Sequence, residues 1–104
     1  MDLADLTIEA IKPYVGTVFE ISLPDGNTTS LTLDDALPYE VHQRRGSRHK
    51  PKREPFSLYL LGDPSLILPQ GMYELRSEAM TFDGLFIVPV GRDDKATEYE
   101  AVFT

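Results

Sequence analysis

Residues 18–33 read VFEISLPDGNTTSLTL, and this stretch decides the fold class. Phe19 and Ile21 alternate with more polar neighbours, a period of two that is typical of a half-buried β-strand. The tetrapeptide PDGN at 24–27 then supplies a turn, because proline presets φ and glycine and asparagine accept positive φ. A second alternating run follows at 28–33. The stretch therefore predicts a β-hairpin.

Further short runs of the same kind lie on the C-terminal side of the hairpin. Residues 37–39 extend its second strand, and other strands are predicted at 56–61, 73–76, 85–90 and 99–103. Pro89 lacks a backbone N–H and so predicts an edge position or a β-bulge. The polar turn at 91–95 predicts that the last two strands form an antiparallel hairpin. Glu98 and Glu100 are expected on the solvent face of the last strand.

The first 14 residues predict a short amphipathic helix. Leu3, Leu6 and Ala10 lie at helical spacing, and either the aspartates near the start of the chain or Thr7 can cap the helix. Pro13 forbids its continuation.

Six short strands and one helix define an all-β fold class. We expect a small antiparallel β-barrel or sandwich of about six strands with a short N-terminal helix over 1–14. A barrel is favoured because closure removes exposed strand edges. The 104 residues suit a single domain, 1–104, and the content of 41% apolar and 26% charged residues is that of an ordinary globular chain.

The net charge of −7 conceals a strong asymmetry. Ten consecutive positions, 44–53, contain six basic residues and no acidic one. Without this basic run the chain has 17 acidic residues against four basic ones, a net charge of −13. We expect 42–53 to form a long mobile loop, because its like charges repel one another. The candidate partner-binding residues are Arg44, Arg45, Arg48, Lys50, Lys52 and Arg53.

Patterns that carry catalytic or metal chemistry are missing from the sequence. The absence of cysteine excludes disulfides, thiolate metal sites and cysteine nucleophiles. His42 and His49 lie in or beside the basic run, where neither a rigid triad nor a standard ligand spacing results. The aspartate pairs at 34–35 and 93–94 are expected at strand ends or turns, with strand neighbours pointing to opposite faces. We therefore expect no enzyme, no cofactor, no metal and no small-molecule substrate.

Several phrases of the sequence together resemble a known family. They are YVGTVF at 14–19, REPFSL at 53–58, LPQGMYEL at 68–75, VPVG at 88–91 and YEAVF at 99–103. In this order they resemble a family of small bacterial proteins catalogued as a domain of unknown function. Members of that family look like neighbours of phage-tail-collar-type and tail-fibre-type proteins, so the resemblance implies a structural or assembly role. The basic stretch is longer and more charged here than in the family pattern.

Two kinds of partner are compatible with these features. The favoured expectation is a structural or protein-interaction module, an accessory of a phage-tail-like assembly, with a protein partner or self-association. The alternative is a nucleic-acid-associated protein that uses the basic run. That run contains no aromatic residue for base stacking, and the acidic remainder repels a polyanion.

The N-terminal sequence and the lengths of the apolar runs bear on localisation. The chain begins MDLAD, without a basic segment followed by an apolar one, and so shows no secretory signal. None of its apolar runs approaches the ~20 residues that span a bilayer. We therefore expect a cytoplasmic protein without a membrane partner.

Overall fold

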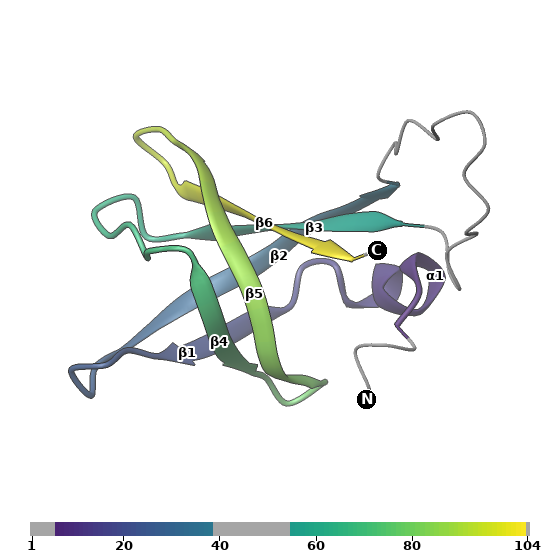
Figure 1. Ribbon diagram of the computed structural model, residues 1–104, viewed down its shortest axis with the longest axis horizontal. Helices are drawn as coiled ribbons and strands as arrows, with labels where there is room; N and C mark the ends of the chain where they lie inside the picture. The colour runs from purple at the N-terminus through teal and green to yellow at the C-terminus, as the bar shows by residue number, and fades with distance from the viewer. Residues whose placement is uncertain (1–5, 39–54, 104) are drawn as a thin grey trace, which may run out of the picture.

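The computed structural model describes residues 6–38 and 55–103, so residues 1–5, 39–54 and 104 lie outside the description. A short helical segment opens the described chain, and β-strands follow it (Figure 1). The elements are α1 (Ile8–Ile11), the 3-10 turn η2 (Lys12–Tyr14), β1 (Val18–Ser22), β2 (Thr28–Pro38), β3 (Phe56–Gly62), β4 (Gly71–Arg76), β5 (Thr81–Arg92) and β6 (Thr97–Phe103).

The strands form a closed antiparallel barrel in the order β1-β2-β3-β6-β5-β4. Pairing of β4 with β1 completes the closure, so each of these strands has two neighbours. The predicted all-β fold with a short N-terminal helix is confirmed, and the closure decides between a barrel and a sandwich. The hairpins β1–β2 and β5–β6 are confirmed as well.

Alternate residues of the strands fill the barrel, as their period of two predicts. Two aromatic pairs anchor this core: Phe19 and Phe82 have ring centroids 5.5 Å apart, and Phe56 stacks on Phe103 at 4.8 Å. Such pairs contribute about 0.5–1.5 kcal/mol beyond the area they bury. The other buried apolar strand residues are Ile21, Leu31, Leu33, Ala36, Leu58, Leu60, Leu75, Leu85, Ile87, Tyr99 and Ala101.

Two irregularities shape β5. The register against β6 shifts between Pro89 and Gly91, so the predicted bulge at Pro89 is confirmed, whereas an edge position is wrong because β5 lies between β4 and β6. The strand also begins at Thr81 rather than at the predicted residue 85. Its buried residues Phe82 and Leu85 are three apart, at a second register shift against β4, and this interrupts the alternation.

A bulge in β2 overturns the prediction that Asp34 and Asp35 point to opposite faces. The register against β3 shifts between Leu33 and Asp35. Leu33 and Ala36 are both buried, while the two aspartates between them are both exposed. The extra residue of the bulge therefore places two neighbouring carboxylates on the outside of the barrel.

The helix is shorter than predicted. It begins at Ile8 because Thr7 caps it: the Thr7 hydroxyl accepts a hydrogen bond from the backbone N–H of Ala10 at 3.2 Å. Of the two predicted caps Thr7 is therefore the one observed, and the predicted positions 1–5 lie outside the described residues. The α-helix ends before Pro13, as predicted, and the chain continues as η2 because proline fits the first turn of a helix.

The connection from β3 to β4 crosses one end of the barrel, because these strands are not neighbours in the sheet. Two hydroxyls of β6 hold it. Thr97 Oγ1 lies 3.1 Å from the carbonyl oxygen of Asp63 and 3.2 Å from that of Leu66. The Tyr99 hydroxyl accepts a 2.9 Å hydrogen bond from the backbone N–H of Leu68. Leu68 is buried, so this hydrogen bond holds its apolar side chain against the core.

Gly62 on β3 lies where the chain cannot accept a side chain. A Cβ at this position would come within 2.6 Å of Leu31 Cδ2 and 3.3 Å of Tyr99 Cε2. We expect Gly62→Ala to lower the free energy of unfolding by about 1–3 kcal/mol, because both neighbours are buried and cannot move aside freely. Gly91→Ala is the matched control, since a Cβ there would meet nothing within 4 Å. Urea denaturation of both variants checks this, and equal destabilisation would contradict the close contact.

Candidate functional site

The outer surface of β2, β3 and β6 carries side chains in rows that follow the strand register. Row 1 is Leu37, Ser57 and Val102, which pair across the three strands. Leu37 is 46% exposed and Val102 47%, high values for large apolar side chains. Ser57 between them is 1% exposed, and its Oγ forms no well-directed hydrogen bond. Row 1 is therefore an apolar strip with a buried hydroxyl at its centre.

Row 2 lies two residues further along the same strands and is acidic. It consists of Asp35, Tyr59, Glu100 and, on β5, Val88. The Tyr59 hydroxyl donates a hydrogen bond to Glu100 Oε2 at 3.1 Å, which ties β3 to β6 on the outside of the barrel. An aromatic ring is thus fixed between two carboxylates of the row.

The environment of Tyr59 keeps its hydroxyl protonated. Partial burial raises the pKa of Tyr59 above its usual value, and the hydrogen bond to Glu100 and the charges of Glu100 and Glu98 raise it further. The Ser57 hydroxyl lowers the pKa of Tyr59, by less than Glu100 raises it. Tyr59 therefore remains a neutral donor at physiological pH.

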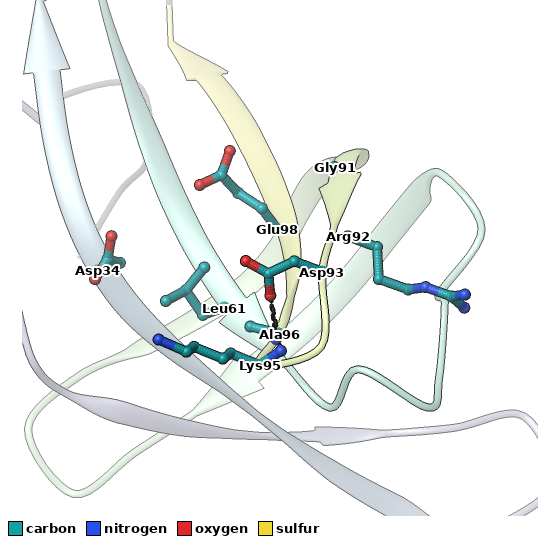
Figure 2. Close-up of a pocket in the computed structure, with 8 residues that line it drawn as sticks. All are labelled: Asp34, Leu61, Gly91, Arg92, Asp93, Lys95, Ala96 and Glu98. Carbon is teal, nitrogen blue, oxygen red and sulfur yellow. Dashed lines mark hydrogen bonds between the residues drawn. The ribbon is translucent and has the colours of Figure 1, made fainter.

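A groove of about 440 Å³ continues the acidic surface beyond row 2 (Figure 2). Leu61 and Glu98 form its floor as a cross-strand pair of β3 and β6, and Asp34 of the β2 bulge forms one wall. In Figure 2 the Lys95 side chain extends toward Leu61 and Asp34, whereas Arg92 points away from them.

The turn after β5 forms the opposite wall of the groove. Asp93 Oδ1 accepts hydrogen bonds from the backbone N–H groups of Lys95 at 2.8 Å and Ala96 at 2.9 Å. These bonds hold the pKa of the Asp93 carboxyl below its usual value. Asp93 therefore stabilises the turn as a carboxylate acceptor at neutral pH.

Asp34, Asp35, Glu98 and Glu100, together with Tyr59, define what we call the acidic face. In the described part of the chain, both ion pairs involve Arg76 instead, which joins Glu20 at 3.1 Å across the β1–β4 closure and Glu74 at 3.6 Å. The charges of the acidic face are therefore not neutralised by ion pairing within the described chain. Although Lys95 and Arg92 also line the groove, this outer surface carries more acidic than basic side chains and so attracts a partner of the opposite sign.

The structure does not describe the candidate residues of the sequence analysis. Arg44, Arg45, Arg48, Lys50, Lys52 and Arg53, as well as His42 and His49, fall outside the described residues. Within 6–38 and 55–103, no group of three or more histidine, cysteine or acidic side chains is arranged to hold a metal ion. The described helices include none that is long and apolar enough to cross a bilayer.

Sequence reasoning found part of the acidic face. The alternation of β6 predicts that Glu98 and Glu100 lie on its solvent side, and this is confirmed by their position outside the barrel. The contribution of Tyr59 was missed, although its alternation with the buried Leu58 and Leu60 signals an outward position. The pairing of β3 with β6, which brings Tyr59 to Glu100, has no local signal.

A comparison with family models identifies the domain. The model described as Domain of unknown function (DUF6916) matches residues 6–103. The chain belongs to this family. The DUF6916 match spans the helix, all six strands and the segment that carries the basic run. Neither a curated protein nor a solved structure matches the chain.

Proposed function

We propose that this DUF6916 protein is a non-catalytic structural or protein-interaction module that binds its partner through row 1 and the acidic face. One observation carries the proposal: the register sets half-exposed Leu37 and Val102 beside a row of carboxylates that form no ion pair with the described residues 6–38 and 55–103. Protein interfaces combine apolar anchors with charged groups that select the partner. Tyr59, a residue type enriched at such interfaces, lies in the middle of this surface.

An accessory role in a larger assembly, such as a phage-tail-like particle, is the setting we propose for this module. It is supported by the family resemblance described above, because members of that family look like neighbours of tail-collar-type and tail-fibre-type proteins. A small barrel that presents one binding surface suits an accessory that attaches to a larger component.

Nucleic-acid binding is the second candidate, and the basic run is the observation that favours it. Six cations within ten residues can neutralise several phosphates. The net charge of −13 on the remaining sequence opposes it, because this charge repels a polyanion that extends beyond the run.

Charge reversal on the acidic face separates these candidates. In capture experiments from the lysate of cells that produce the protein, we expect the double variant Asp34→Lys and Glu98→Lys to retain at least about tenfold less partner protein, because like charges across an interface cost several kcal/mol. Neither side chain makes an ion pair in the described structure, and the Tyr59–Glu100 hydrogen bond stays intact.

The control for this experiment reverses two exposed acids elsewhere, Glu78→Lys and Asp83→Lys, with the same change of net charge. Capture that falls equally in both double variants would contradict a role of the acidic face. Capture that disappears after nuclease treatment, and after replacement of Arg44, Arg45 and Arg48 by glutamine, would favour the nucleic-acid candidate instead.

A further inference from the structure

We propose that the outer surface of β4 and β5 is a separate docking site, which takes an apolar side chain flanked by lysine or arginine on a segment of another protein. Met72 and Phe86 form the apolar part of this site, which we call the platform. Neither residue belongs to row 1 or to the acidic face, so the inference goes beyond the proposed function. It rests on the exposure of the pair, on the glycine beside it and on the charges around it.

The platform consists of two large apolar side chains that lie opposite each other on neighbouring strands. Met72 on β4 pairs with Phe86 on β5 (Figure 1). Met72 is 65% exposed, more than any other large apolar side chain of the described chain, and Phe86 is 49% exposed. Leu85 and Ile87 are buried on either side of Phe86, so its ring points out of the barrel. Side chains paired in this way are in contact and form one continuous apolar surface.

Gly84 on β5 leaves room for the end of the Met72 side chain. A Cβ at Gly84 would lie 3.3 Å from Met72 Cε, which is closer than ordinary van der Waals contact. The methyl group of Met72 therefore lies over β5, in the space that the glycine leaves open. Methionine is flexible and polarisable, and methionine and aromatic residues are enriched at binding surfaces. The platform thus has the composition of an adaptable binding surface.

Carboxylates border the platform at both ends along β5. At one end Val88 pairs with Glu100, two residues or about 7 Å from Phe86. At the other end the register against β4 shifts, so that Glu74 lies opposite Asp83 and the glycine that follows it. Asp83 and Glu74 are both exposed. The apolar surface is therefore flanked by negative charge on two sides.

These charges select the occupant of the platform. Arg76 forms both ion pairs of the described chain, and it reaches Glu74 but neither Asp83 nor Glu100. The borders therefore stay negative and favour an apolar side chain with a cation on each side. A second copy docked platform to platform would set carboxylates against carboxylates, and the phosphates of a nucleic acid or a membrane would be repelled. A basic segment of another protein fits both features.

Selection from a random-peptide library tests this chemistry. Short peptides displayed on phage are selected on the full-length protein and depleted on the variant Phe86→Ser, which removes peptides that bind the acidic face. We expect the enriched sequences to share a large apolar residue with lysine or arginine about two or three positions away on both sides. Enrichment of acidic sequences or of sequences without an apolar residue would overturn the proposal, as would no enrichment over the variant.

Binding of one enriched peptide to purified variants locates the site. Met72→Ser and Phe86→Ser should each lower the affinity at least about tenfold, because each removes one of the two apolar contacts. Val18→Ser is the matched control, since Val18 is 57% exposed on β1, and it should leave the affinity unchanged. Circular dichroism checks that the strands are kept. Equal losses in Met72→Ser and Val18→Ser would contradict the platform.

The charge-reversed variant Asp34→Lys and Glu98→Lys separates this site from the proposed function. It should bind the peptide as the wild-type protein does, because neither residue borders the platform. If the peptide depends on Asp34 and Glu98 but not on Met72, the platform is wrong while the acidic face remains a binding surface. If the peptide depends on Met72 and lysate capture is insensitive to Asp34 and Glu98, the reverse holds.

Methionine methyl resonances distinguish the other possible occupants. In protein with labelled methionine, the peptide should shift the methyl signal of Met72 but not that of Met80, which packs against the core. A Met72 signal that shifts with protein concentration in the absence of peptide would identify a second copy as the occupant. Nuclear Overhauser contacts from Met72 to Tyr39 or Val41 would identify the chain itself. Either result would overturn the proposal of another protein as the occupant.

Discussion

Replacing Tyr99 with alanine is expected to lower the free energy of unfolding by about 3–5 kcal/mol, which is a large part of the stability of a small domain. Tyr99 is 1% exposed and is the largest fully buried side chain of the described core. Its ring packs within the barrel, and its hydroxyl holds the backbone N–H of Leu68 at 2.9 Å. The substitution therefore opens a cavity and releases the connection between β3 and β4. Urea denaturation followed by circular dichroism measures the loss.

Tyr99→Phe separates packing from hydrogen bonding in this prediction. The ring stays, but the buried N–H of Leu68 loses its acceptor, at a cost of about 1–3 kcal/mol. Tyr73→Phe is the matched control, because the Tyr73 hydroxyl donates to the carbonyl oxygen of Pro69 at 2.8 Å in the same connection but at an exposed site. A Tyr99→Phe variant as stable as Tyr73→Phe would contradict the structural role of the buried hydroxyl.

Loss of stability at alkaline pH is the second large effect that we expect. Burial raises the pKa of Tyr99 above its unfolded value of about 10. Below that pH both states hold the proton, and the contribution of Tyr99 is fully present. As the pH rises toward the folded pKa, the unfolded chain releases a proton that the folded chain keeps. The free energy of unfolding then falls by about 1.4 kcal/mol per pH unit for this group.

Unfolding curves recorded at intervals from pH 7 to 11 test this effect, with Tyr99→Phe as the reference. The variant lacks the ionisable hydroxyl, so its stability should decline less steeply above pH 10 than that of the wild-type protein. Tyr59, whose pKa is also raised, still titrates in both proteins and cancels in the comparison. Parallel curves for the two proteins would show that Tyr99 is not protected from ionisation by burial.

The strands were predictable where their signals are local. The hairpin of β1 and β2 follows from alternation and from the turn at 24–27, where Gly26 adopts the positive φ of 87° that the turn chemistry requires. The bulges were only partly predictable. Pro89 signals one of them through its missing N–H, but the shift that places Phe82 and Leu85 on one face depends on pairing with β4.

The acidic face shows the same division between local and non-local information. Outward positions of Glu98 and Glu100 follow from the alternation of β6. The acidic face as a whole depends on two features that no local stretch of sequence reveals. They are the pairing of β3 with β6 and the bulge that turns Asp34 outward next to Asp35. The basic run is visible in the sequence alone, whereas the complete acidic face is visible only in the fold.

Site-specific photocross-linking is the most direct test of the claim that the outer surface of β2, β3 and β6 binds protein. A photoreactive phenylalanine analogue at Val102 on β6 is compared with the same analogue at Val18 on β1, which is 57% exposed and belongs to a strand outside the proposed surface. In the cells that produce the protein, we predict a discrete protein adduct from position 102, with a mass that identifies a second copy or another chain, and none from position 18. The absence of an adduct at position 102, or equal yields from both positions, would contradict the account.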